Sequence, residues 1–250
     1  MPRFLKIAHR GASGSFPENT RLAFRKAIEA RVDMIEMDCQ LSKDGHIVVF
    51  HDEKLSRIAK ARGKVGQTSL EQLKKLDIGR WRDKGFRGER IQTLEEVLSV
   101  IDGDARLCID IKQYPGSPAG IELKLLFILS HFDCLEHVIL SSFDHRCLWR
   151  IRELAPQARI GLIYGKGAME DPFTVTAGLG AFSIHVQKEL ASREIIHRAW
   201  DEGLDVIVWT VNDTREIEKF ASLGVQGIMS DFPVRFWQER THATRPTWAG

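Results

Sequence analysis

The chain has 250 residues, and its 36 Lys and Arg side chains against 34 Asp and Glu side chains give a formal net charge of +2. A charge this small, with both signs mixed along the chain, argues against a partner such as nucleic acid. Hydrophobic residues make up 43% and charged residues 28%, which excludes a disordered chain, a collagen-like chain and a small disulfide scaffold.

The sequence also carries no membrane signal. No apolar run reaches the roughly 18 residues that a membrane-spanning helix needs. At the N-terminus, His9-Arg10 comes before the apolar region of a signal peptide could form. We therefore expect a cytoplasmic location and no stable membrane insertion.

Short runs rich in β-branched residues alternate with segments of helical periodicity. The predicted strands are Phe4–His9, Met34–Gln40, Arg106–Lys112, Val138–Phe143, Ile160–Tyr164, Ala181–Val186, Asp205–Val211 and Gly227–Asp231. The predicted helices include 19–30, a segment that begins at Thr93, 193–201 and 214–222.

Strands that alternate with helices pair in parallel, because parallel pairing needs crossover connections. Eight such units in 250 residues predict a (β/α)8 TIM barrel, with residues 1–250 forming a single domain. An open doubly wound sheet is the alternative. It is weakened by the lack of a GxGxxG turn after the first strand.

A β-hairpin is predicted directly after the second strand. Asp44-Gly45 is a strong signal for a two-residue turn. Such a turn pairs residues whose numbers add to 89, which places His51 directly across from Asp38. Glu36 would lie on the same face, two residues along the strand.

The hairpin opens an insertion over about residues 41–92. Its later part is basic and contains Arg80, Trp81 and Phe86. Two interpretations stay open for these residues: a lid or side wall of a pocket, or plain packing against the barrel. The tail over 241–250 is expected to be loosely held.

Three carboxylates are candidates for a metal site. Active sites of TIM barrels lie at the C-terminal ends of the strands, and Glu36, Asp38 and Asp110 are predicted to point inward there. Burying them together is costly, because like charges repel and each loses its hydration. A divalent cation that prefers oxygen ligands, Mg²⁺ or Ca²⁺ with Mn²⁺ as a third candidate, would relieve this cost. The alternative is a structural ion-pair network with Arg10 and Lys112.

Two histidines are expected to lie beside these carboxylates at the same end of the barrel. His9 ends the first strand and His51 follows the hairpin, so one can accept a proton while the other donates one near neutral pH. Arg10 and Lys112 add positive charge suited to phosphate oxygens. Together these residues predict cleavage of a phosphoester. His185, at the end of the sixth predicted strand, is a weaker candidate.

Several motifs follow one another in order along the chain. They are His9-Arg10-Gly11, Pro17-Glu18-Asn19-Thr20, Glu36-Met37-Asp38, Lys43-Asp44-Gly45, His51-Asp52, Leu76-Asp77-Ile78-Gly79-Arg80-Trp81, Thr93-Leu94-Glu95-Glu96, Trp209-Thr210-Val211-Asn212 and Gly227-Ile228-Met229-Ser230-Asp231. This ordered set resembles the glycerophosphodiester phosphodiesterase family over about residues 5–235. The resemblance implies a TIM barrel with one divalent metal ion. It also implies hydrolysis of small-molecule glycerophosphodiesters to glycerol 3-phosphate and an alcohol.

The resemblance also implies roles for single residues. The catalytic pair would be His9 and His51, and two of the metal ligands would be Glu36 and Asp38. Phosphate contacts are implied for Arg10 and Lys112, pocket walls for Phe143 and Trp209, and a partner of Arg10 or of the metal for Glu18.

The chain departs from the family pattern at the third metal ligand. The family usually has Glu in a Glu-x-Lys triplet, whereas this chain has Asp110. One methylene less shortens the reach by about 1.5 Å, taking the C–C bond as the scale. The identity of the metal is therefore more open than the activity. Gln92, where proline is common, and Ser230, where threonine is usual, are milder changes.

The expected mechanism is metal-dependent hydrolysis with His9 as general base and His51 as general acid, and the reverse assignment stays open. The nucleophile is water or a neighbouring hydroxyl of the substrate, which would first give a cyclic phosphate. One alternative function is a phosphodiesterase or cyclising lyase for a sugar phosphodiester or another headgroup. A remote alternative is a barrel that binds phosphodiesters without cleaving them. The alcohol released and the oligomeric state, a homodimer included, are left open.

Overall fold

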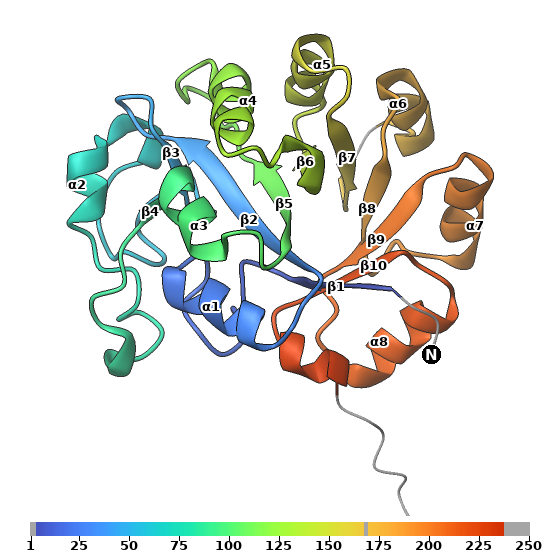
Figure 1. Ribbon diagram of the computed structural model, residues 1–250, viewed down its shortest axis with the longest axis horizontal. Coiled ribbons are helices and arrows are strands. Elements are labelled where there is room, and N and C mark those ends of the chain that lie inside the picture. The colour runs from blue at the N-terminus through green and yellow to red at the C-terminus, as the bar shows by residue number, and fades with distance from the viewer. Residues whose placement is uncertain (1–3, 168–169, 238–250) are drawn as a thin grey trace, which may run out of the picture.

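The computed structural model of the protein describes residues 4–167 and 170–237. Within these ranges, parallel strands form a ring in the order β1, β10, β9, β8, β7, β6, β5 and β2, and β1 pairs with β2 to close it (Figure 1). The closed ring confirms the predicted (β/α)8 barrel. The alternative, an open doubly wound sheet, would end in two edge strands that do not pair with each other. The expected loose tail over 241–250 lies outside the described residues.

The observed strands lie close to the predicted ones. The ring consists of β1 (Leu5–Ala8), β2 (Met34–Leu41), β5 (Arg106–Ile111), β6 (Val138–Ser142), β7 (Arg159–Tyr164), β8 (Ser183–Gln187), β9 (Asp205–Trp209) and β10 (Gly227–Ser230). Two short strands extend the sheet: β3 (Ile47–Val49) pairs antiparallel with β2, and β4 (Gln92–Thr93) pairs antiparallel with β3.

Helices surround the ring, as Figure 1 shows. They are α1 (Arg21–Glu29), α2 (Leu70–Lys74), α3 (Leu94–Ile101), α4 (Ile121–His131), α5 (His145–Leu154), α6 (Pro172–Leu179), α7 (Arg193–Asp201) and α8 (Thr214–Ser222). Thr93 and Glu96 form a capping box at the start of α3, the helix predicted to begin at Thr93. None of the helices in the described part of the chain has the length and apolarity to cross a bilayer. The cytoplasmic location stays a prediction.

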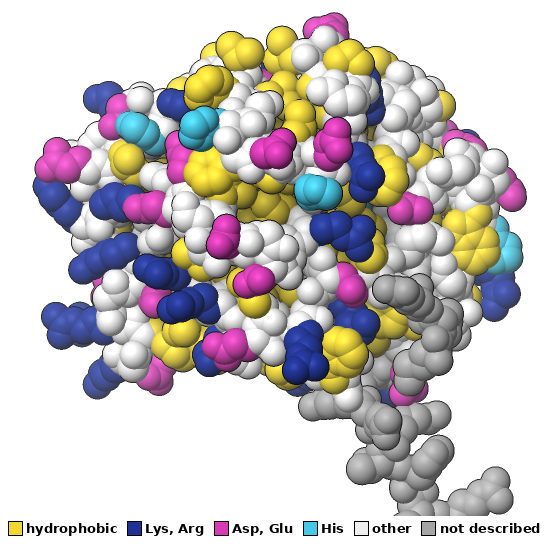
Figure 2. Space-filling view, viewed as in Figure 1, with side chains coloured by type: hydrophobic (Ala, Val, Ile, Leu, Met, Phe, Trp, Pro, Cys, Tyr) yellow, Lys and Arg dark blue, Asp and Glu magenta, His cyan; other side chains and the backbone are white. Residues whose placement is uncertain are grey.

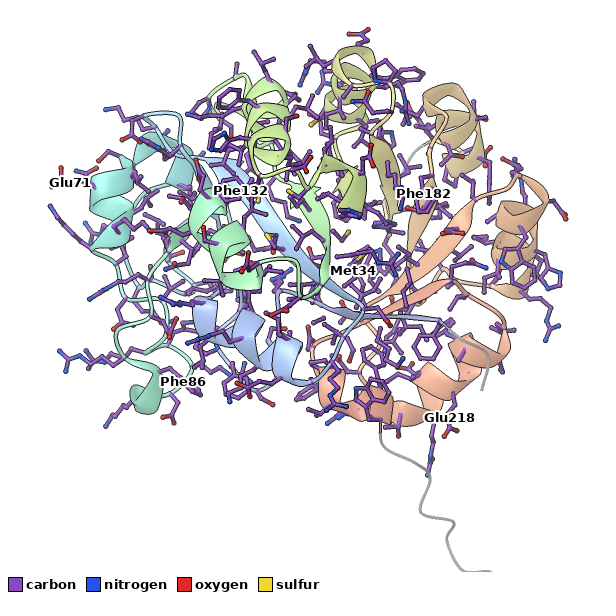
Figure 3. The ribbon with its side chains drawn as sticks, viewed as in Figure 1. Met34, Glu71, Phe86, Phe132, Phe182 and Glu218 are labelled. Carbon is purple, nitrogen blue, oxygen red and sulfur yellow. The ribbon has the colours of Figure 1, made fainter. Side chains whose placement is uncertain are left out.

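The interior of the ring is apolar at one end and polar at the other. Ile7, Met34, Cys108 and Met229 belong to a buried cluster inside the barrel, and Figure 3 shows Met34 near its centre. Side chains alternate between the two faces of a strand. The residues two positions after Met34 and Cys108 therefore also point inward, at the carboxyl ends of β2 and β5. Packing of apolar side chains at one end of the barrel thus determines which side chains of β2 and β5 point inward at the other end.

The hairpin forms, but its predicted register is wrong by one residue. Cys39 pairs with Val49, and the Phe50 N–H donates to the Asp38 carbonyl oxygen at 2.9 Å, so Phe50 rather than His51 lies across from Asp38. The turn has three residues, 43–45, instead of two. Gly45 has φ +79°, a conformation that favours glycine. The Asp44 carboxylate accepts the Leu70 N–H at 3.0 Å, which ties the turn to α2.

The rest of the insertion packs around a hydrophobic cluster of its own. This cluster contains Val48, Phe50, Leu55, Ile58, Val65, Leu73, Ile78 and Ile91. Phe86, at the outer end of the insertion in Figure 3, makes an edge contact with Phe16, with ring centroids 5.9 Å apart. Arg80 is exposed to solvent. These contacts favour the packing interpretation of Phe86, because its ring lies against Phe16 of the loop between β1 and α1.

At Gly79 the backbone of the insertion packs closely against the backbone of Phe86. A Cβ atom at this position would lie 1.9 Å from the Phe86 carbonyl oxygen, whereas at Gly85 it would meet only the exposed Asp83 side chain, at 3.1 Å. We expect Gly79→Ala to lower the free energy of unfolding by about 1–3 kcal/mol, because the backbone must move to make room. Urea denaturation measures this, with Gly85→Ala as the matched control. Equal stability of the two variants would contradict the steric argument.

Candidate active site

Three carboxylates meet inside the polar end of the barrel. Glu36 and Asp38 come from β2 and Asp110 comes from β5, where Asp38 and Asp110 are register partners. One oxygen from each carboxylate lies within 4.8 Å of the others, and all three side chains are buried. The shorter side chain of Asp110 therefore still reaches the cluster. The inward direction predicted from the sequence agrees with this placement.

Two cations lie against the same carboxylates. Lys112 Nζ is 3.2 Å from Asp38 Oδ1 and donates to Asp110 Oδ2 at 2.5 Å. Arg10 Nε is 3.1 Å from Asp38 Oδ2, and the Arg10 backbone N–H donates to Glu36 Oε2 at 2.9 Å. Burial disfavours the charged form of Asp38, but Arg10 and Lys112 outweigh it and hold the pKa of Asp38 well below its usual range. The ion pairs considered from the sequence are thus present.

These ion pairs leave part of the cluster uncompensated. Among the described residues, nothing hydrogen-bonds to the buried Asp110 Oδ1. Burial and the charge of Asp38 raise the pKa of Glu36 to about 7, and burial raises the pKa of Asp110 although Lys112 opposes it. A buried carboxylate oxygen with no partner, beside two others, suits a divalent cation that prefers oxygen ligands. The residues present therefore fit such an ion.

Two residues take a left-handed backbone conformation to build this arrangement. Arg10 has φ +55° and Asn19 has φ +56°. Asn tolerates this conformation, whereas for a long side chain it costs about 1–3 kcal/mol. Both conformations serve the site, because the Arg10 N–H contacts Glu36 and Asn19 Nδ2 donates to Asp38 Oδ2 at 2.8 Å.

His9 is held by a carboxylate from the last strand of the ring. His9 Nδ1 lies 2.7 Å from Asp231 Oδ1, and His9 Nε2 lies 4.0 Å from Glu36 Oε2. Burial works against it, but the hydrogen bond from His9 lowers the pKa of Asp231 to about 2. An ionised carboxylate only accepts, so Nδ1 carries the proton of this bond and Nε2 faces the carboxylate cluster.

His51 is held in the same way by its neighbour in the chain. His51 Nδ1 lies 2.7 Å from Asp52 Oδ1, and the Tyr114 hydroxyl donates to the His51 carbonyl oxygen at 2.7 Å. Burial lowers the pKa of His51. Asp38 opposes the shift while Arg10 and Lys112 add to it, and the result is below the ordinary 6.5. His51 thus comes to the site on the segment after β3 rather than across the hairpin ladder.

The remaining predicted residues surround a narrow cavity. Its volume is about 50 Å³. The cavity is lined by His9, Arg10, Glu36, Asp38, Asp110, Ser141, Ile163, His185, Trp209 and Met229. Phe143 stands at the rim, half exposed, with its ring 5.8 Å from that of Trp209 in an edge contact. Glu18 accepts from Arg10 Nη1 at 2.9 Å and does not belong to the metal-type cluster.

The comparisons with known proteins agree with this geometry. Residues 9–235 match the glycerophosphoryl diester phosphodiesterase family. A glycerophosphodiester phosphodiesterase of Caldanaerobacter subterraneus subsp. tengcongensis is 40% identical over 92% of this chain and 94% of its own length. The chain belongs to this family. The expected family is thus confirmed, and with it the expected enzyme class, glycerophosphodiester phosphodiesterase.

Solved structures of the family superpose on this barrel. An Oleispira antarctica phosphodiesterase in complex with the product sn-glycerol-3-phosphate gives a TM-score of 0.84 at 27% identity, covering 94% of this chain and 96% of that one. A glycerophosphodiester phosphodiesterase from Agrobacterium tumefaciens gives 0.81 at 27% identity, covering 94% and 99%.

The sequence-based site omitted several residues of this phosphodiesterase. Asp231, Asn19 and Asp52 contact the predicted residues directly, and all three occur in the motifs without an assigned role. A signal existed for Asp231, because a closed barrel brings the end of β10 beside the end of β1. Tyr114 and Arg57 gave no such signal, because Tyr114 is 63 residues from His51 and Arg57 is 39 residues from Glu18.

His185 lies inside the barrel as the sequence indicated, but with a different environment from the other two histidines. Burial lowers the pKa of His185 to about 3. Its Nε2 contacts the Ser183 hydroxyl at 3.0 Å, and within residues 4–167 and 170–237 its Nδ1 has no hydrogen-bond partner. A neutral, fully buried ring fills the wall of the cavity and is poorly suited to proton transfer near neutral pH.

The contact with Asp231 generates a prediction about His9. Burial lowers the pKa of His9, but the hydrogen bond to Asp231 and the charge of Glu36 raise it above 6.5. Asp231→Asn removes the charge that stabilises the imidazolium, so the pKa of His9 should fall. NMR titration of the ring measures this. Asp201→Asn, at the exposed end of α7, is the control, and an equal shift in both variants would contradict the assignment.

Proposed function

We propose that this protein hydrolyses glycerophosphodiesters to sn-glycerol 3-phosphate and an alcohol with the help of one divalent cation. The observation that carries the proposal is the buried cluster of three carboxylates, in which Asp110 Oδ1 has no partner among the described residues. Arg10 and Lys112 lie against these carboxylates, and Arg10 and His9 line a narrow cavity together with them. The product named for the Oleispira antarctica relative, sn-glycerol-3-phosphate, supports the same substrate class.

Glu36, Asp38 and Asp110 would hold the cation, with Mg²⁺, Ca²⁺ and Mn²⁺ as the candidates. Such an ion supplies a Lewis acid that stabilises charge on phosphate oxygens. Its presence would also relieve the repulsion between Glu36 and Asp38 that raises the pKa of Glu36.

Arg10 and Lys112 would bind the phosphate of the substrate. Lys112 has three N–H donors, and the two carboxylates of Asp38 and Asp110 engage two of them. Arg10 has five donors: its Nη1 donates to Glu18, and its Nε lies 3.1 Å from Asp38 Oδ2 without a hydrogen bond to any described residue. Each side chain therefore keeps donors for a phosphate oxygen while the carboxylates fix its position.

His9 and His51 would transfer the protons. Asp231 and Asp52 hold the Nδ1 atoms of the two rings, so each ring offers Nε2 for chemistry. One ring would take the proton of the nucleophile while the other gives a proton to the leaving alkoxide. Phe143 and Trp209 would form an apolar wall against the carbon skeleton of the substrate.

Substitution of either histidine tests the acid–base pair. We expect His9→Ala and His51→Ala each to lower kcat by about 10²–10⁴-fold, because a positioned acid or base contributes an effect of this size. Steady-state kinetics on glycerophosphocholine measures it. His46→Ala, in the hairpin turn region, is the control and should keep full activity. Wild-type activity in both site variants would overturn the assignment.

Removal and return of the cation tests the function itself. Treatment with EDTA should abolish turnover, and Mg²⁺, Ca²⁺ or Mn²⁺ added separately should show which ion restores it. Phosphorus NMR of the products then distinguishes sn-glycerol 3-phosphate from a cyclic phosphate, the product of a lyase. Full turnover after exhaustive EDTA treatment would contradict the need for a cation. No turnover with any ion on any glycerophosphodiester would contradict the function.

A further inference from the structure

Arg57 of the insertion holds two carboxylates at once. Its Nε and Nη2 atoms donate to the two oxygens of Asp52 at 2.6 and 2.9 Å. Its Nη1 and Nη2 atoms donate to the two oxygens of Glu18, both at 2.8 Å. Two adjacent edges of one planar guanidinium are thus filled by two bidentate ion pairs, an arrangement of high geometric specificity.

Each of these carboxylates contacts one residue of the proposed chemistry. The Asp52 oxygen that Arg57 Nη2 holds, Oδ1, is also the acceptor for His51 Nδ1 at 2.7 Å. The Glu18 oxygen that Arg57 Nη2 holds, Oε1, also accepts from Arg10 Nη1 at 2.9 Å. A single nitrogen atom of Arg57 therefore connects the carboxylate that orients His51 with the carboxylate that orients Arg10.

The position of Arg57 is itself fixed by packing. Its neighbours Leu55 and Ile58 are almost fully buried in the cluster of the insertion. The Ala59 N–H donates to the Leu55 carbonyl oxygen at 3.0 Å, which makes one turn around Arg57, and the Trp81 ring lies 5.9 Å from its guanidinium. The folded insertion thus presents the guanidinium at a defined place beside the barrel mouth.

Arg57 differs from most cations of the insertion. Figure 2 shows Lys and Arg side chains along the edge of the molecule where the insertion lies, and Arg57 is exposed to solvent like Arg62, Arg80 and Arg87. Arg57 instead uses four N–H groups on two carboxylates, which leaves one of its five donors free and neutralises its charge. Such a group is poorly suited to attract a phosphate and well suited to hold other side chains.

We propose that Arg57 is a positioning residue that holds His51 and Arg10 in their working orientations through Asp52 and Glu18. The expected effects of Arg57 on kcat and KM rest on the proposed function, whereas its effect on the orientation of His51 does not. It gives the insertion a part in positioning the site, because Arg57 belongs to the insertion and not to the strands of the barrel. Lysine cannot replace Arg57, since one ammonium group cannot form two bidentate pairs in a plane.

Kinetics on glycerophosphocholine with the restoring cation tests this inference. Arg57→Gln should lower kcat by about 10²-fold, because a misoriented His51 costs an effect of this size, and should also raise KM through Arg10. Arg57→Lys keeps the charge and should lose nearly as much activity. Arg62→Gln removes an exposed charge from the same insertion and should match the wild type in both parameters. Thermal melts establish that each variant is folded.

A double-substitution cycle separates positioning from a general structural effect. If Arg57 acts on kcat through Asp52, Arg57→Gln should cost little further kcat in the Asp52→Asn background. Fully additive losses in kcat, or Arg57→Gln kinetics equal to those of Arg62→Gln, would overturn the proposal.

A readout that needs no turnover completes the test. In ¹⁵N-histidine NMR of the folded protein, neutral His51 should carry its proton on Nδ1, with its signals assigned by their loss in His51→Ala. In Arg57→Gln this tautomer should no longer dominate, because Asp52 is no longer fixed. Unchanged His51 signals would overturn the proposal. If the wild type cleaves no glycerophosphodiester, the proposed function fails, and the NMR comparison still decides the role of Arg57.

Discussion

The burial of Glu36, Asp38 and Asp110 at one end of the barrel is the constraint on which the rest of the site depends. Three carboxylates that share one small space repel one another and lose their hydration. The protein compensates them from every side with Arg10, Lys112 and backbone or amide N–H groups. Arg10 takes a left-handed backbone conformation, and in this conformation its N–H donates to Glu36.

The two histidines are oriented by the same kind of contact. Each donates Nδ1–H to an aspartate, Asp231 or Asp52, and so presents Nε2. The two aspartates come from opposite ends of the sequence: Asp231 follows the last strand of the ring, whereas Asp52 follows the hairpin. Closure of the ring between β1 and β10 brings the first pair together, and the insertion supports the second. The site is therefore assembled from both halves of the chain.

The insertion has its own hydrophobic cluster, and one of its residues, Arg57, connects it to the active site. Arg57 joins it to Glu18 in the loop before α1 and to Asp52 beside His51. The packing of Leu55 and Ile58 is thus linked through two ion pairs to the carboxylates that contact His51 and Arg10. A segment outside the barrel thereby takes part in the geometry of the barrel's active end.

The sequence by itself determined the strands, the barrel and the residues at the strand ends. The β-branched runs and the alternation of side chains are local properties, which is why Glu36, Asp38 and Asp110 could be assigned to the interior. The register of the hairpin could not be read in this way. In the structure, Asp44 of the turn accepts a hydrogen bond from the N-terminus of α2, a contact between residues distant in sequence that local patterns do not reveal. Only the tertiary structure decided that Asp231 holds His9, that Tyr114 contacts the His51 backbone and that Arg57 joins Asp52 to Glu18, because closure of the ring and folding of long loops bring these residues together.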